Sequence, residues 1–183
     1  MSGKKTAVFG IYTTREGVER AVDTIVNSGF ASSDVSVLLP ENLGGKAIGT
    51  EKATKAPEGT ATGAGAGAII GGTLGVLAGV GLLAIPGLGP FIAAGPIMAG
   101  LAGLGVGGAV GGLTGGLIGL GIPEYEAKRY EGRLQKGGIL LSVHCDTSEE
   151  IKRGKQIMKA TGAEDISSTG ESSSKSATAT ANR

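Results

Sequence analysis

The stretch "TAVFGIYTTREGVERAVDTIVNSG", from Thr6 to Gly29, decides the fold expected for this chain. Its first seven residues, Thr6–Tyr12, are β-branched and aromatic and predict a strand. Thr13 and Glu16 have the spacing of a capping box, which marks the start of a helix. The helix that follows stops at Gly29 and has one apolar face, formed by Val18, Ala21, Val22, Ile25 and Val26.

The same β-α-β order occurs a second time near the end of the chain. The first half closes with a strand over Asp34–Pro40, and the second half begins with a strand over Gly138–Cys145. Thr147 and Glu150 form another possible capping box, and the short stretch "AEDISS" is the last predicted strand. A shift of 133 positions aligns the two halves, pairing Val18 with Ile151, Ile25 with Met158 and Gly29 with Gly162.

Two halves of this size predict an α+β protein with a ferredoxin-like βαβ…βαβ sandwich, in which two helices cover one face of a four-stranded antiparallel sheet. The alternative is that two short amphipathic helices align by chance. A further helix is predicted before the third strand, in "IPEYEAKRYEGRLQKGG", where Pro123 occupies the first turn. Its inward face comprises Ala127, Tyr130 and Leu134.

Between the two halves lies a glycine-rich region without charge. The 65 residues from Gly59 to Pro123 contain no Asp, Glu, Lys, Arg or His. Glycine recurs there at every fourth position, which places a smooth stripe along one side of a helix and lets a second helix approach closely. Helices are predicted over Gly63–Ile85 and Ile97–Gly121, joined by a proline-rich turn. The predicted helix-packing residues are Gly63, Gly67, Gly71, Gly75, Gly79, Gly103, Gly107, Gly111, Gly115 and Gly119.

The length of these two segments favours a membrane. Each has at least the roughly 20 residues that span a bilayer, and lysines and arginines flank both ends of the pair. The sequence therefore predicts a glycine-zipper hairpin in the inner (cytoplasmic) membrane, with both termini cytoplasmic and membrane lipid as a partner. The alternatives are a cytoplasmic, soluble oligomer whose glycine helices pack between subunits, and a disordered low-complexity segment.

These patterns divide the chain into five parts. Residues 6–40 form the first half of the α/β domain, residues 41–62 a linker, and residues 63–121 the glycine-rich hairpin. The extra helix and the second half occupy residues 122–168. Residues 169–183 have no apolar pattern and are expected to be a disordered tail.

Signs of catalytic or cofactor chemistry are weak. "GLGVGG" at Gly103–Gly108 lacks the preceding strand and the downstream acid of a dinucleotide site. His144 and Cys145 are adjacent and point to opposite faces of a strand, so they cannot form a nucleophile–base pair with each other. Cys145 is expected to be a small core residue. The 17 basic and 16 acidic residues nearly cancel, which gives no general attraction to nucleic acid. We therefore expect no enzyme activity, no metal and no cofactor; Glu124, Glu126 and Glu131 are expected to form a solvated helix face.

The order of these segments resembles the bacterial general stress protein 17M-like family, which includes heat-induced and low-temperature-induced stress proteins. The resemblance covers about residues 6–167 and is most specific in "AIPGLGPFIAAGP" and in "GIPEYEAKRYEGRLQKGGILLSV". It implies a stress-response protein without an established enzymatic activity. The leading hypothesis is a membrane-anchored, self-associating stress protein; the alternatives are an oligomeric regulatory or small-ligand-binding module, and a pore.

Overall fold

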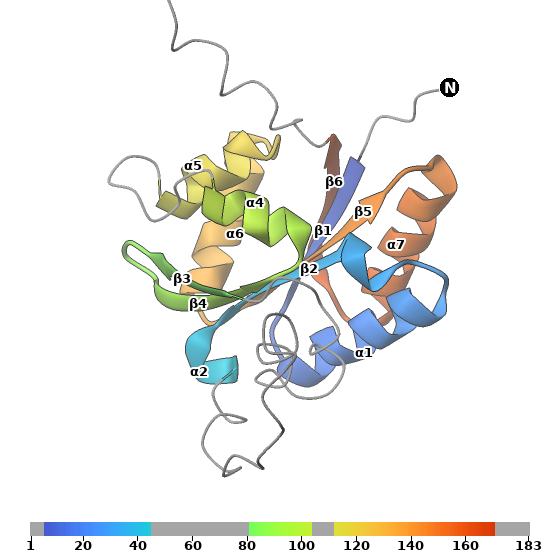
Figure 1. Cartoon of the computed structure of the whole chain (residues 1–183), viewed down its shortest axis with the longest axis horizontal. Helices are drawn as coiled ribbons and strands as arrows, with labels where there is room; N and C mark the ends of the chain where they lie inside the picture. Colours follow the sequence, from blue (N-terminus) through green and yellow to red (C-terminus); the bar gives the residue numbers. More distant parts are fainter. Residues whose placement is uncertain (1–5, 45–80, 104–111, 171–183) are drawn as a thin grey trace, which may run out of the picture.

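A computed structural model describes residues 6–44, 81–103 and 112–170 of the chain (Figure 1). In these residues, six strands form one antiparallel sheet with the order β3-β4-β2-β5-β1-β6. The strands are β1 (Thr6–Tyr12), β2 (Val35–Pro40), β3 (Gly81–Ile85), β4 (Gly89–Ala94), β5 (Ile139–Cys145) and β6 (Glu164–Gly170). The helices are α1 (Arg15–Asn27), η1 (Ser32–Asp34), α2 (Glu41–Gly44), α4 (Pro96–Gly103), α5 (Gly112–Gly119), α6 (Glu124–Gln135) and α7 (Ser148–Ala160). The predicted α+β class is confirmed.

One face of the sheet is covered by α1 and α7, which pack against each other (Figure 1). Val8 and Tyr12 of β1 point to this face and meet Val22 and Ile25 of α1 and Met158 of α7. Each of these side chains is at most 1% exposed. Because burial of a large apolar side chain stabilises a fold by about 1.5–3 kcal/mol, this layer is a major part of the core.

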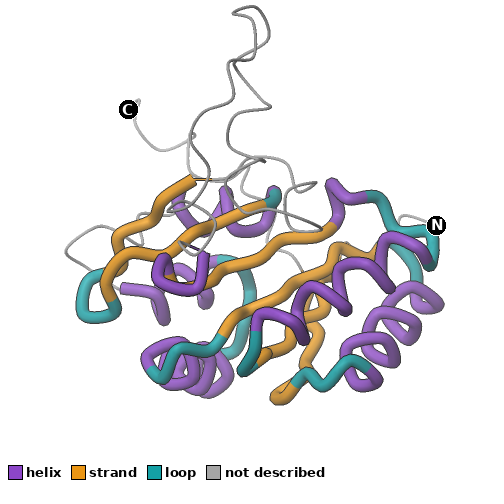
Figure 2. The backbone as a smooth tube through the Cα atoms, turned by 90° about the horizontal axis from the view of Figure 1, so that it is seen from below, coloured by secondary structure: helices purple, strands orange, loops and turns teal. Residues whose placement is uncertain are grey.

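The opposite face of the sheet is covered by α4, α5 and α6, and Figure 2 shows helices on both sides of the strands in a second view. The alternate β1 residues Ala7, Phe9 and Ile11 point to this face. They form a second core with side chains of the three helices and of the β3–β4 hairpin: Leu83, Phe91, Met98, Leu101, Leu117 and Tyr130. The described part of the uncharged region therefore belongs to the fold, as the cover of the second face of the sheet.

The helix boundaries follow the predicted signals closely, with one shift. Thr14, rather than Thr13, begins α1: its hydroxyl accepts a hydrogen bond of 3.2 Å from the backbone N–H of Gly17. Strand β1 ends at Tyr12 and α1 begins at Arg15. Thr14 has an extended backbone directly before the first helical turn, so it is the N-cap residue in place of the adjacent Thr13. The capping box of Thr147 and Glu150 is confirmed at the start of α7.

Two predicted glycine stops are also confirmed. Gly29 and Gly162 follow the ends of α1 and α7 with φ angles of 103° and 94°. A residue with a side chain adopts this left-handed conformation at a higher free energy than glycine, which has no Cβ atom. The inward residues of α6 are those expected, since Ala127, Tyr130 and Leu134 are all buried.

The helical hairpin predicted over residues 63–121 is wrong at the end of its first helix and at its turn, where the structure has strands. Gly81–Ile85 and Gly89–Ala94 are strands of the main sheet, paired from Gly81 opposite Ala93 to Ile85 opposite Gly89. Short apolar runs such as "LLAI" and "FIAA" fit a buried strand and a buried helix equally well by periodicity. Pro86 and two glycines at positive φ, Gly87 and Gly89, make the tight turn between them.

The predicted membrane anchor is also wrong. No helix in residues 6–44, 81–103 or 112–170 is long and apolar enough to cross a bilayer. The second predicted helix, Ile97–Gly121, contains two described helices of 8 residues each, α4 and α5. Residues 45–80, which include most of the first predicted helix, lie outside the described residues, as do most of the predicted linker and tail.

Candidate functional site

Few of the predicted helix-packing glycines lie in the described structure. Gly103 ends α4, and Gly115 and Gly119 belong to α5. Gly63, Gly67, Gly71, Gly75, Gly79, Gly107 and Gly111 lie outside the described residues. Apart from its chain neighbours and the backbone of its own helix, a Cβ atom on Gly115 would meet no described atom within 4 Å, so the described residues leave space beside this glycine. The role of the glycines in helix packing stays a prediction.

The outer surface of β3, α4 and α5 forms what we call the uncharged side of the molecule. Gly81–Ile122 contains no charged residue, and these three elements lie together at one end of the molecule (Figure 1). Leu82 is 72% exposed on β3 and Ile118 is 42% exposed on α5. The other exposed residues of the uncharged side are Gly81, Ala84, Pro96, Ala99, Gly100 and Gly119.

Strand β3 is an edge of the sheet, and its described partner is β4 alone. Edge strands present unpaired backbone N–H and C=O groups, and proteins commonly guard them with charges, prolines or bulges. The sequence of β3, "GLLAI", contains no charge and no proline, and its pairing with β4 is regular. In the described residues, the uncharged side therefore combines a strand edge without charge, proline or bulge with exposed apolar side chains.

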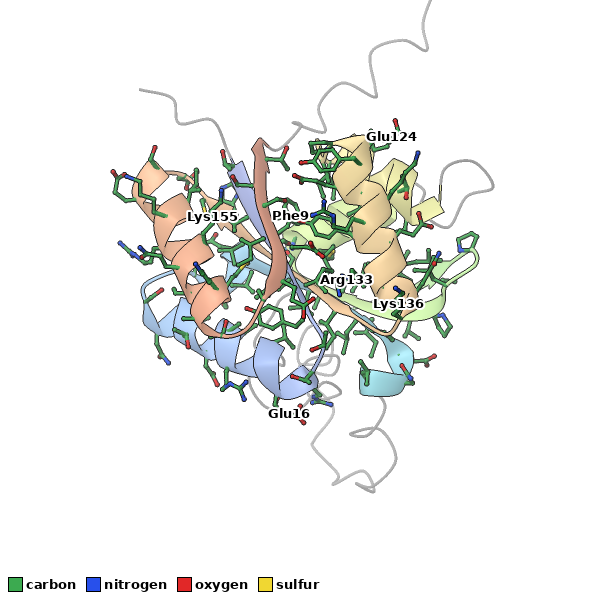
Figure 3. All side chains as sticks on the ribbon, turned by 180° about the vertical axis from the view of Figure 1, so that it is seen from behind. Phe9, Glu16, Glu124, Arg133, Lys136 and Lys155 are labelled. Atoms are coloured by element: carbon green, nitrogen blue, oxygen red, sulfur yellow. The ribbon has the colours of Figure 1, made fainter. Side chains whose placement is uncertain are left out.

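A second candidate site lies at the opposite edge of the sheet, between β6 and α6. Figure 3 shows the two elements side by side, with the Arg133 side chain between them. The pairing of β6 with β1 contains a bulge: Ile11 lies opposite Glu164 and Phe9 opposite Ser167. The bulge inserts an extra residue and redirects the side chains around it.

Asp165 occupies this bulge in a left-handed conformation, with a φ angle of 50°. Among non-glycine residues, aspartate tolerates this region comparatively well. The carboxylate of Asp165 accepts hydrogen bonds of 3.0 Å from Arg129 and 3.0 Å from Arg133, one on each oxygen. Arg133 also contacts the carboxylate of Glu164 at 2.7 Å. The bulge thus positions one carboxylate to hold two arginines of α6.

Tyr130 extends this network into the core. Its hydroxyl donates a 2.9 Å hydrogen bond to the backbone carbonyl of Asp165 and lies 2.7 Å from the Ser167 hydroxyl. The side chain is 1% exposed, and this burial raises the pKa of Tyr130 to about 12. Tyr130 therefore stays protonated at neutral pH and acts as a hydrogen-bond donor that fixes β6 on α6.

The surface between these elements forms a hollow of about 200 Å³, which we call the α6–β6 pocket. The lining residues are Tyr125, Glu126, Arg129, Tyr130, Asp165, Ile166 and Ser167. Tyr125 is 63% exposed, and the guanidinium of Arg129 lies 5.8 Å from the centre of its ring. The Tyr125 hydroxyl donates a 2.8 Å hydrogen bond to Glu126. Tyrosine and arginine are enriched among the residues that contribute most to protein–protein binding.

The chemically reactive residues considered from the sequence lie elsewhere. Cys145 is fully buried in the core, as predicted. His144 points away from it and lies 3.2 Å from the carboxylate of Asp146. Of the glutamates expected to form one solvated helix face, Glu124 pairs with Lys128, whereas Glu131 accepts a hydrogen bond from Thr114 of α5. In the described ranges, no group of three or more His, Cys, Asp or Glu side chains is arranged to hold a metal ion.

Two buried serines lie beneath α4. Ser36 and Ser142 are cross-strand neighbours on β2 and β5, and both are fully buried. The Ser36 hydroxyl accepts a 3.0 Å hydrogen bond from the backbone N–H of Ile97, near the start of α4. The Ser142 hydroxyl has no hydrogen-bond partner among the residues that the structure places. Ser36 therefore anchors α4 to the sheet, whereas Ser142 leaves a buried polar atom unsatisfied.

Sequence reasoning missed the α6–β6 pocket. Arg129 and Arg133 have the i, i+4 spacing that puts both on one helix face, which the sequence does reveal. Their partner Asp165 is 36 residues from Arg129 in the chain, and only the pairing of β6 with β1 brings the two together. The bulge at Asp165 has no marker such as glycine in the sequence.

Comparisons of the chain with models of protein families, with curated proteins and with solved structures find no match.

Proposed function

We propose that this protein is a non-enzymatic, self-associating module of the bacterial stress response, related to the general stress protein 17M-like family. The motifs "AIPGLGPFIAAGP" and "GIPEYEAKRYEGRLQKGGILLSV" support the relationship. The membrane anchor forms no part of the proposal. Self-association takes place through the uncharged side.

We also propose that the domain is an enlarged ferredoxin-like sandwich. The strand order β6-β1-β5-β2 supports this, because a ferredoxin-like sheet orders its four strands as fourth, first, third and second along the chain. The two helices α1 and α7 on one face of these strands support it as well. In this proposal, β3, β4 and α4–α6 are additions that extend the sheet by two strands and cover its second face.

The observation that carries the proposed self-association is the uncharged, unguarded edge strand β3. In a two-fold dimer, residues near the axis meet their own copies, so a charge there would face the same charge. Gly81–Ile122 presents no such charge, which suits pairing with a second copy of this chain. Pairing of β3 with its copy would satisfy the outward backbone groups and bury Leu82, which is 72% exposed in the single chain.

The mass of the full chain in solution tests this proposal. Light scattering after size exclusion should give a dimer or a larger, discrete assembly. Leu82→Lys places a charge on the edge strand at an exposed position, so it should leave the fold intact and shift the mass to that of a monomer. Ile118→Lys tests in the same way whether α5 contributes.

The matched control is Ser168→Lys, which puts the same charge on β6, the opposite edge of the sheet. This variant should keep the mass of the parent protein. A monomeric parent protein at all concentrations, or an assembly that persists in both Leu82→Lys and Ile118→Lys, would contradict the proposal.

A further inference from the structure

We propose that the α6–β6 pocket binds a small zwitterion of the α-amino acid class, with the ligand carboxylate on Arg129 and the ligand ammonium group on Glu126. The pocket lies on α6 and β6, and β6 is the edge of the sheet opposite β3. The inference is therefore independent of self-association through the uncharged side, and either can fail alone.

The size of the pocket limits the ligand. A volume of about 200 Å³ is smaller than the roughly 300–1,000 Å³ of pockets that enclose drug-sized molecules. A single amino acid or another molecule of similar size fits this space. A dinucleotide or a long peptide would extend beyond it.

The charges that line the pocket are of both signs. Asp165 already binds Arg129 and Arg133, and Glu164 binds Arg133, so two carboxylates and two guanidinium groups balance one another within the protein. Arg129 uses Nη1 for Asp165, and a guanidinium carries five N–H donors in all. Its side chain is 52% exposed, so the group can also be reached from solvent.

Glu126 supplies the opposite charge. It accepts the Tyr125 hydroxyl on Oε1, and a carboxylate has lone pairs on both oxygens for further donors. Glu126 and Arg129 are three residues apart on α6, so they are neighbours on one face of the helix. A cation and an anion side by side match the ammonium and carboxylate groups that an α-amino acid carries on one carbon.

The rest of the lining is arranged before any ligand arrives. The hydrogen bonds of Tyr130 to Asp165 and Ser167 fix β6 against α6. Tyr125 lies against the guanidinium of Arg129 and offers a flat aromatic wall, and Ile166 adds apolar surface. Preorganised groups lose little conformational entropy when a ligand binds, and this raises the affinity of a weakly enclosed site such as this one.

Calorimetric titration of the full chain with the standard L-amino acids, one at a time, tests the inference. At least one of them should bind, and acetate and methylammonium, which each carry half of the zwitterion, should bind far more weakly. Glu126→Gln and Arg129→Gln should each weaken binding about tenfold to hundredfold, because each removes a charged hydrogen-bond partner.

The matched control is Lys128→Gln, which removes a charge from the same helix outside the pocket and should leave the affinity unchanged. If loss of the Asp165 contact unfolds Arg129→Gln, Glu126→Gln still tests the site. Failure of every amino acid to bind the parent protein would overturn the inference. Equal binding of acetate and amino acids, or unchanged affinity in Glu126→Gln, would also overturn it.

Discussion

The two faces of the sheet differ in how they are built, although each buries an apolar core. The face under α1 and α7 is covered by amphipathic helices with clear caps and glycine stops. The face under α4, α5 and α6 is covered largely by short segments rich in glycine and alanine, without charge from Gly81 to Ile122. The difference teaches that uncharged segments, here the described residues between Gly81 and Ile122, can be the second layer of a domain rather than a separate membrane element.

The largest expected effect compares one large side chain from each face. Leu117 of α5 and Ile25 of α1 are both 0% exposed, so replacing either with alanine should lower the free energy of unfolding by about 2–5 kcal/mol. Urea denaturation of the two variants measures this. A cost below about 1 kcal/mol for Leu117→Ala, with a full cost for Ile25→Ala, would show that the second face is not a packed core.

The next comparison concerns two glycines of the uncharged region. A Cβ atom on Gly95 would lie 2.2 Å from the Val35 carbonyl oxygen, and the φ angle of Gly95 is 91°. Gly95→Ala should therefore cost about 3 kcal/mol or more. Gly115→Ala meets open space in a helix and should stabilise the fold by about 0.5–1 kcal/mol. Thermal melts that show equal effects for both variants would mean that α4 does not pack against β2 as described.

A pH comparison probes the link between the second face and β6. Burial raises the pKa of Tyr130 to about 12 from an ordinary value of 10, so the folded state holds this proton more tightly than the unfolded state. The stability from Tyr130 is present in full below pH 10 and is lost as the pH rises toward 12. The loss should amount to about 2–3 kcal/mol.

The control for this pH dependence is Tyr130→Phe, which removes the ionisable group and keeps the ring. Burial also raises the pKa of Tyr12, so both proteins should lose some stability in alkali, and the parent protein should lose more. Chemical denaturation at several pH values between 9 and 12 measures the difference. Parallel curves for the two proteins would contradict the buried placement of Tyr130.

The smallest expected effects come from the two serines under α4. Ser36→Ala should cost about 1–3 kcal/mol, because it leaves the backbone N–H of Ile97 buried without an acceptor. Ser142→Ala removes a hydroxyl that has no partner in the described chain, so it should be neutral or stabilise the fold by about 1 kcal/mol. Denaturation curves of the two variants should therefore separate, with Ser36→Ala the less stable, and a clear loss of stability in Ser142→Ala would count against this arrangement.

Much of the first face follows from local signals in the sequence. The strand Thr6–Tyr12, the capping box at Thr147 and the stop at Gly162 depend on neighbouring residues alone, and each is confirmed. The second face depends on long-range contacts. "LLAI" and "FIAA" become strands because β2 offers an edge for β4, and their pattern alone does not distinguish a strand from a helix.

The candidate sites were harder to predict than the fold. The absence of charge around Leu82 is visible in the sequence, but its exposure at a sheet edge is not. The α6–β6 pocket requires the bulge at Asp165, which places a carboxylate opposite Arg129 across a long stretch of chain. A non-glycine residue in a left-handed conformation leaves no mark in the sequence.

Amide hydrogen exchange most directly tests whether the uncharged region covers the sheet. The measurement uses the full Leu82→Lys chain in aqueous buffer without lipid or detergent, so that self-association through β3 does not contribute to protection. Peptides from α4 and α5 should exchange slowly, with protection approaching that of β1 and β5, because these helices share a buried core with the sheet. Exchange of α4 and α5 at the rate of an unfolded peptide, while α1 and α7 stay protected, would contradict this structure of the second face.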